Sequence, residues 1–126
     1  MRTHHLDTVF LASPTSTEAR LKRAARLSSG FLYLISRTGV TGERSEIAAG
    51  IKPLAERARR LTSLPLAVGF GISTPEQVRE VQAHADAAVV GSAVVHVIEE
   101  HYSTGGPAAI EQFVRGLKAA AGGITV

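Results

Sequence analysis

Two glycine turns, each directly after a short apolar segment, constrain the fold of this chain most. The first turn, Gly69–Gly71, follows Leu66–Val68, and the second, Gly91–Ser92, follows Ala87–Val90. A turn of this kind at the start of a helix presents backbone N–H groups and the positive end of the helix dipole, and both bind phosphate well. We therefore expect an anion site at the carboxyl ends of two strands.

The order of apolar and amphipathic segments predicts an α/β fold with parallel strands. The expected strands are Thr8–Ala12, Phe31–Ser36, the segment ending at Gly69, and Ala87–Val90. Neighbouring strands that end in phosphate-binding turns are typical of the last two strands of a TIM barrel, which needs roughly 250 residues when complete. The chain has 126 residues. These observations predict a partial TIM (β/α)8 barrel, the last four βα units, as a single domain over residues 1–126.

Each expected strand leads into an expected helix. Apolar spacing and cap signals place the helices at about 17–28, 53–63, 75 onward and 93–101, with a last amphipathic helix after Pro107. Thr74, Pro75 and Gln77 form a capping-box pattern. Residues 37–50 contain three glycines and no clear period. They predict a long loop, and such loops are usually functional, often as lids. The first strand is expected to be buried, and the second to be covered on both faces.

Composition narrows the class of partner. The net charge is +3, but the basic residues are spread over predicted helices, which indicates solvated faces and argues against nucleic-acid binding. The chain has no cysteine, no apolar run of membrane-spanning length and no signal-peptide pattern. The histidines lack ligand spacing, so no metal site is expected. The expected location is cytoplasmic, with no membrane contact.

Four segments together resemble the tryptophan synthase alpha subunit, in the same order and with similar spacing: Phe10–Thr17, Gly30–Gly42, Val68–Ser73 and Val90–Ala93. The resemblance runs from about Leu6 to Ala120, and its most specific part is the segment from Ser36 to Gly42. It implies strands five to eight of the barrel. It also implies a retro-aldol lyase of tryptophan biosynthesis, which cleaves indole-3-glycerol phosphate to indole and glyceraldehyde 3-phosphate. The family needs no cofactor for this step and passes indole to a beta subunit.

The resemblance assigns residues to the two ends of the substrate. Phosphate contacts fall on Gly42, Gly71, Gly91 and Ser92, and Gly69 is expected to allow close approach of backbone and ligand. The indole end is lined by Tyr33, Phe70 and Val89, and Thr41 lies in the loop that closes over the substrate. Without the resemblance, the glycines are tight turns, Ser92 is a helix cap, and the larger side chains fill the barrel interior.

The catalytic pair of the family, a Glu and an Asp, belongs to the first half of the barrel and has no counterpart in these residues. The proton transfers of the reaction therefore have no expected catalytic residue here. Glu43 and Glu46, in the expected loop, are the only candidates to replace the pair, whereas Asp7 and Asp86 precede strands and fall at the opposite, stabilising face.

Three hypotheses about function remain open from the sequence, beside a different phosphate-binding barrel enzyme, for which the match from Ser36 to Gly42 would be a coincidence. The chain is the half of a lyase that works only with an N-terminal half-barrel, or a non-catalytic phosphate-binding half-barrel that self-associates or complements another chain. The third is an inert product of a decayed gene. A half-barrel leaves two strand edges without partners, which favours association with itself or with another chain.

Overall fold

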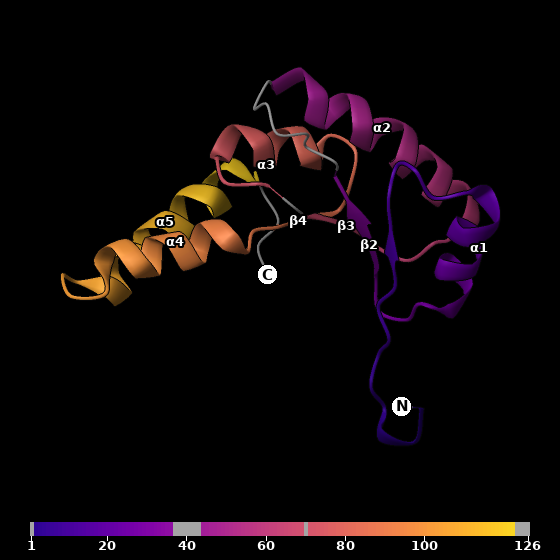
Figure 1. The fold of residues 1–126 in the computed structure, drawn as a ribbon, viewed down its shortest axis with the longest axis horizontal. Helices are drawn as coiled ribbons and strands as arrows, with labels where there is room; N and C mark the ends of the chain where they lie inside the picture. The colour runs from indigo at the N-terminus through magenta and orange to yellow at the C-terminus, as the bar shows by residue number, and fades with distance from the viewer. Residues whose placement is uncertain (1, 37–43, 70, 123–126) are drawn as a thin grey trace.

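Four parallel strands form one sheet, with helices between them along the chain (Figure 1). The computed structural model describes residues 2–36, 44–69 and 71–122, with the backbone alone described for residues 2 and 44–49. The strands are β1 (Leu11–Ala12), β2 (Leu32–Ile35), β3 (Leu66–Gly69) and β4 (Ala87–Val89), and they pair in this order. The helices are η1 (Arg2–His4), α1 (Glu18–Leu27), α2 (Arg44–Leu61), α3 (Pro75–Gln82), α4 (Ser92–His101) and α5 (Gly106–Ala120). The predicted α/β order with parallel strands is confirmed.

The helices α1, α2 and α3 lie on one side of the sheet (Figure 1). Ala12, Leu34 and Val68 pair with one another across β1, β2 and β3 and are almost fully buried. They belong to one core cluster with apolar residues of these helices. Because side chains alternate along a strand, this row faces the helices and the neighbouring row faces the other way.

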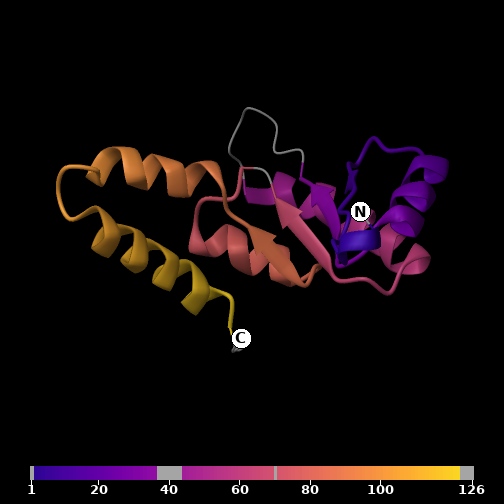
Figure 2. The ribbon, with the colours of Figure 1, turned by 90° about the horizontal axis from the view of Figure 1, so that it is seen from below.

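The opposite face of the sheet is open to solvent at its end. Leu11 pairs with Tyr33, and its side chain is 58% exposed, while Tyr33, Ile35 and Val89 are half-buried. The view from below looks onto the strands with α2 and α3 behind them (Figure 2). The predictions that the first strand is buried and the second covered on both faces are therefore wrong. The described residues supply one helical layer, and β1 is an edge strand.

The start of α2 is also different from the sequence-based prediction. Residues 44–50, predicted as loop, form the first turns of α2, and Pro53 lies inside the helix instead of at its start. Proline is most favourable in the first turn of a helix, and for this reason the sequence analysis placed the start of this helix at Pro53. Ile51, Leu54, Ala55 and Ala58 are all buried, so packing of this face outweighs the cost of an interior proline.

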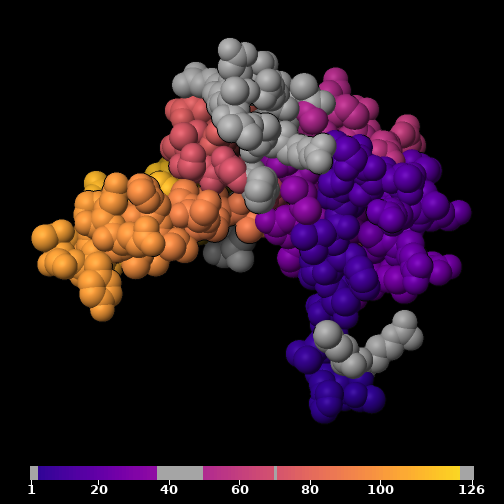
Figure 3. All heavy atoms as spheres, viewed as in Figure 1, coloured from indigo at the N-terminus to yellow at the C-terminus, as the bar shows by residue number. Residues whose placement is uncertain are grey.

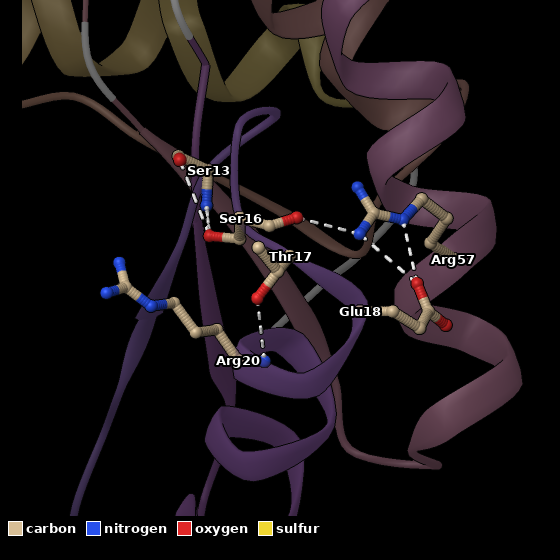
Figure 4. A network of polar contacts seen from close by, with 6 residues as sticks. All are labelled: Ser13, Ser16, Thr17, Glu18, Arg20 and Arg57. Carbon is tan, nitrogen blue, oxygen red and sulfur yellow. Dashed lines mark hydrogen bonds and ion pairs between the residues drawn. The ribbon is translucent and has the colours of Figure 1, made fainter.

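The turn between β1 and α1 is held by α2. The Ser16 N–H donates to Ser13 O. Thr17 Oγ1 caps α1 by accepting from the Arg20 N–H at 3.3 Å (Figure 4). Arg57 of α2 donates to Ser16 O at 2.8 Å and to Glu18 Oε2 at 3.2 Å. This clamp fixes the position of α1 against α2 at the carboxyl end of β1.

Asp86 ties the starts of β3 and β4 together. Its Oδ2 accepts from the Leu66 N–H at 2.8 Å and from the Arg59 guanidinium at 2.7 Å. The hydrogen bond from Leu66 lowers the pKa of the Asp86 carboxyl, Arg59 lowers it further, and partial burial opposes both. Asp86 therefore stabilises the end of the sheet that lies away from the glycine turns.

We expect Asp86→Ala to lower the free energy of unfolding by about 1 kcal/mol near neutral pH, because the Leu66 N–H loses its acceptor. Folding lowers the pKa of Asp86, so the carboxylate stabilises the protein above the ordinary pKa of Asp. This stabilisation is lost as the pH falls. The difference in the free energy of unfolding between wild type and variant should therefore become smaller below about pH 4. Urea denaturation at neutral and acid pH measures both quantities. Glu56→Ala, at an exposed position of α2, is the matched control. A difference independent of pH would contradict this role of the charge.

Candidate functional site

An open hollow lies at the carboxyl ends of β3 and β4, where the sequence predicts the phosphate site. Its volume is about 550 Å³. The turn after β3 contributes Gly71 and Ser73, and the start of α4 contributes Ser92 and Ala93. The remaining lining residues are His96, Val97 and Phe113. The structure thus brings Gly71 and Ser92 to one hollow, with Gly91 next to Ser92 in the chain.

The two helices that begin at this hollow differ in how their first N–H groups are used. At α3, Gln77 Oε1 accepts from the N–H groups of Ser73 and Thr74 at 2.8 and 3.1 Å, while Thr74 Oγ1 accepts from the Gln77 N–H. The predicted capping box is confirmed. These N–H groups are therefore satisfied by the helix's own side chains. The start of α4 is thus better placed to donate hydrogen bonds to an anion.

The start of α4 has Gly91 at the cap position, and none of the described side chains caps it. Gly91 O accepts from the N–H groups of Val94 and Val95, so the groups before them point out of the helix end. Space for a methyl group at Gly91 is open, with none of the described atoms within 4 Å. An uncapped helix start beside an open hollow is a favourable place for an anion.

Gly71 shapes the first of the two turns. Its φ angle is +77°, a left-handed conformation that favours glycine. The residue is exposed and leads from β3 toward the capped start of α3. A larger residue at this position would strain the backbone, so the shape of this side of the hollow depends on Gly71 being glycine.

Tyr33, Gly69 and Ser36 join the carboxyl ends of β2 and β3. A methyl group at Gly69 would lie 1.8 Å from Tyr33 Oη and 2.5 Å from its Cζ, so the phenol ring fills the space over this glycine. The Ser36 N–H and Oγ both donate to Gly69 O, at 3.0 and 3.2 Å. Gly69 permits a close approach, as expected from the sequence, but the group that approaches it in this structure is Tyr33.

Val89 lies at the end of β4, in register with Gly69, which itself pairs with Ile35. Tyr33, Gly69 and Val89 therefore share the face of the sheet that the helices leave open. The other expected site residues, Thr41, Gly42 and Phe70, lie outside the described residues, as does Glu43. Only the backbone of Glu46, in α2, is described.

Two residues of this region were not singled out from the sequence. His96 lines the hollow one turn into α4, with Nε2 3.3 Å from Glu100 Oε1 and Nδ1 3.9 Å from Glu99 Oε2. Its spacing from Ser92 on the same helix would have indicated this position. Ser36 is only 2% exposed. A serine directly after an apolar strand gives no signal that its hydroxyl reaches the neighbouring strand.

The described walls of the hollow, formed by residues from Gly71 to Phe113, carry no acidic side chain. In the described part of the chain, no group of three or more His, Cys, Asp or Glu side chains could hold a metal ion. The walls of the hollow thus offer hydrogen-bond donors and apolar surface.

None of the described helices has the length and apolar character needed to cross a membrane.

The sheet order, the helical layer and the hollow define a partial (β/α)8 barrel, which corresponds to the second half of the complete fold. Residues 1–122 match the family model of the tryptophan synthase alpha chain, and the chain belongs to this family of lyases. The alpha chain of Solibacter usitatus is 53% identical over 119 residues, which are 94% of this chain and 45% of the relative. That of Roseiflexus castenholzii is 46% identical over 117 residues, 93% of this chain and 45% of the relative.

Solved structures agree with this assignment. Tryptophan synthase subunit alpha from Campylobacter jejuni superimposes with a TM-score of 0.79 at 27% identity, over 92% of this chain and 45% of that one. Tryptophan synthase from M. tuberculosis, in an open form, gives a TM-score of 0.77 at 28% identity, over 95% and 42%. The chain therefore spans less than half the length of the relatives that it matches.

The contact of Tyr33 with Gly69 can be tested by a double-mutant cycle. Gly69→Ala is expected to lower the free energy of unfolding by about 1–3 kcal/mol, because the new methyl group overlaps the phenol ring. In a Tyr33→Leu background the same change should cost clearly less, because the obstructing ring is gone. Chemical denaturation of the four proteins measures the coupling. Equal costs in both backgrounds would show that the ring does not occupy this space.

Proposed function

We propose that this chain is the substrate-phosphate half of an indole-3-glycerol phosphate lyase, the alpha reaction of tryptophan synthase. Family membership supports the reaction class. The observation that carries the assignment to this half is the hollow shared by Gly71 and Ser92 at the uncapped start of α4. There the N–H groups of the first turn and the Ser92 hydroxyl would hold the phosphate of the substrate.

The indole end of the substrate would lie toward the open face of the sheet. Tyr33 and Val89 are half-buried on that face, close to the carboxyl ends of their strands. An apolar face with one phenol hydroxyl suits an aromatic ring whose remaining polar group is an N–H. Binding at both ends would orient the bond between the indole ring and the glycerol chain for cleavage.

Cleavage of that bond needs a proton delivered to the indole ring and a base for the glycerol hydroxyl. The described walls of the hollow contain no carboxylate. We propose that both groups are the Glu and Asp that the family carries in the first part of its barrel, and that these 126 residues alone bind phosphate without appreciable turnover. The indole product would pass to a beta subunit, as the relation to tryptophan synthase implies.

Ser92→Glu tests the phosphate site directly. A carboxylate at the first residue of α4 would repel the anion and compete for the same N–H groups, so affinity for glycerol 3-phosphate should fall about tenfold or more. Ser103→Glu adds the same charge at an exposed position between α4 and α5 and should leave the affinity unchanged. Isothermal titration calorimetry with both variants makes the comparison. Equal binding by the two variants would place the anion elsewhere.

Indole release from indole-3-glycerol phosphate tests the reaction. The purified chain should release almost no indole. A mixture with the N-terminal part of the Solibacter usitatus alpha chain, where the family pattern places the Glu and Asp, should release it. Ser92→Glu in the same mixture should lower kcat/KM. Turnover by the chain alone would overturn the assignment of catalysis to the other part. An inactive mixture, with both parts folded and bound to each other, would overturn the lyase proposal.

A further inference from the structure

His96 is the one side chain that titrates near neutral pH among the described residues that line the hollow. Histidine changes its charge between about pH 5 and 8, whereas backbone N–H groups and serine hydroxyls donate hydrogen bonds over that whole range. The helix α4 lies at the surface of the molecule (orange, on the left in Figure 3), and the His96 side chain is 70% exposed. The hollow therefore combines donors that do not change with pH and one side chain whose charge does.

The position of His96 relates it to the uncapped N–H groups. It follows Ser92 by four residues on α4, so the two side chains lie on the same side of the helix, one turn apart. Side chains of a helix lean toward its N-terminus, which directs the imidazole back toward the turn that begins with Ser92. An anion held by that turn would lie on the order of 5 Å from the ring, the length of one helical turn.

The described charges that face His96 come from its own helix. Nε2 lies 3.3 Å from Glu100 Oε1, and Nδ1 lies 3.9 Å from Glu99 Oε2. The turn after β3 brings only uncharged residues to the hollow, and α5, which packs against α4, contributes Phe113. The charged residues in the described part of α5 lie on the side of that helix opposite Phe113. They are Glu111, Arg115 and Lys118.

The protonation of His96 thus decides which charge an anion meets at this helix start. An imidazolium carries an N–H on both nitrogens, so it can donate to Glu99 and to Glu100 and offset their charges. A neutral imidazole leaves two carboxylates close to the N–H donors, and these repel an anion. Among the described lining residues, His96 is the one that can supply a positive charge to the hollow.

We propose that His96 is the cationic member of the phosphate site, and that its protonation strengthens the binding of an anion at the start of α4. This inference rests on the proposed function for the place of the phosphate, and it adds a binding residue and a pH dependence to that site. Binding is tighter at the lower pH, because the imidazolium is present only there. Linkage is reciprocal, so an anion that binds near neutral pH also promotes the uptake of a proton by His96.

Isothermal titration calorimetry with sulfate tests this inference. Sulfate stays a dianion over the whole range, so any change of its affinity with pH belongs to the protein. Wild-type chain should bind sulfate about three- to fivefold more tightly at about pH 5.5 than at about pH 8.5. Near neutral pH, proton uptake should make the binding enthalpy depend on the ionisation enthalpy of the buffer.

Two variants of His96 separate its charge from its size. His96→Gln should bind weakly at both pH values and take up no proton. His96→Lys keeps a positive charge throughout, so it should bind at both pH values about as tightly as wild type does at the lower one. The position is exposed, so circular dichroism should show wild-type helix content for both variants. His84→Gln is the matched control, because His84 lines a different hollow between α2 and α3, and it should keep the wild-type pH dependence.

The outcomes distinguish this inference from the phosphate site itself. Ser92→Glu should weaken sulfate binding at both pH values. If it does, but His96→Gln retains the wild-type pH dependence, His96 has no such role and the phosphate site stands. The role is also refuted if His96→Lys binds as weakly as His96→Gln at the higher pH. Sulfate binding that Ser92→Glu leaves unchanged, or a folded wild-type chain that binds no sulfate, would contradict the phosphate site and the role of His96 together.

Discussion

The pairing of β2 with β3 is the interaction on which the rest of this structure depends. These two strands run in register from Leu32 with Leu66 to Ile35 with Gly69, and they are the inner strands of the sheet. One row of their side chains fills the core under the helices, where Leu34 and Val68 are buried. The other row sets Tyr33 over Gly69, and Ser36 then closes the ends of the strands through Gly69 O. Stability and site geometry thus come from the same strand pair.

Sequence reasoning predicted the order of strands, their parallel arrangement, the capping box of α3 and the two turns that meet at the hollow. These features depend on local signals: apolar runs, cap residues and glycines at helix starts. The early start of α2 was missed because the signals of Pro53 and of the glycines before it favour a loop, whereas buried contacts such as that of Ile51 decide the outcome.

Other errors arose because burial is not a local property. An apolar strand such as Phe31–Ser36 shows that it can be covered on both faces, but not which element covers each of them. The same limit applies to Ser36, whose bond to Gly69 O joins residues far apart in the chain. The pocket residues Tyr33 and Val89 came from the family resemblance. The structure adds that they share the open face with Gly69.

The contrast between the starts of α3 and α4 connects the site to the incomplete end of the sheet. At α3 the N–H groups of Ser73 and Thr74 donate to Gln77, so these donors are occupied. At α4 the donors are uncapped, and none of its residues is fully buried, although the helix packs against α5. Covering α4 with a neighbouring strand and helix would immobilise the donors in advance of binding, and a preorganised site binds more tightly. Linkage is reciprocal, so an anion that binds the ordered α4 must strengthen the contact that orders it by the same factor. Phosphate binding and closure of the sheet would then be two parts of one equilibrium, with α4 as the shared element.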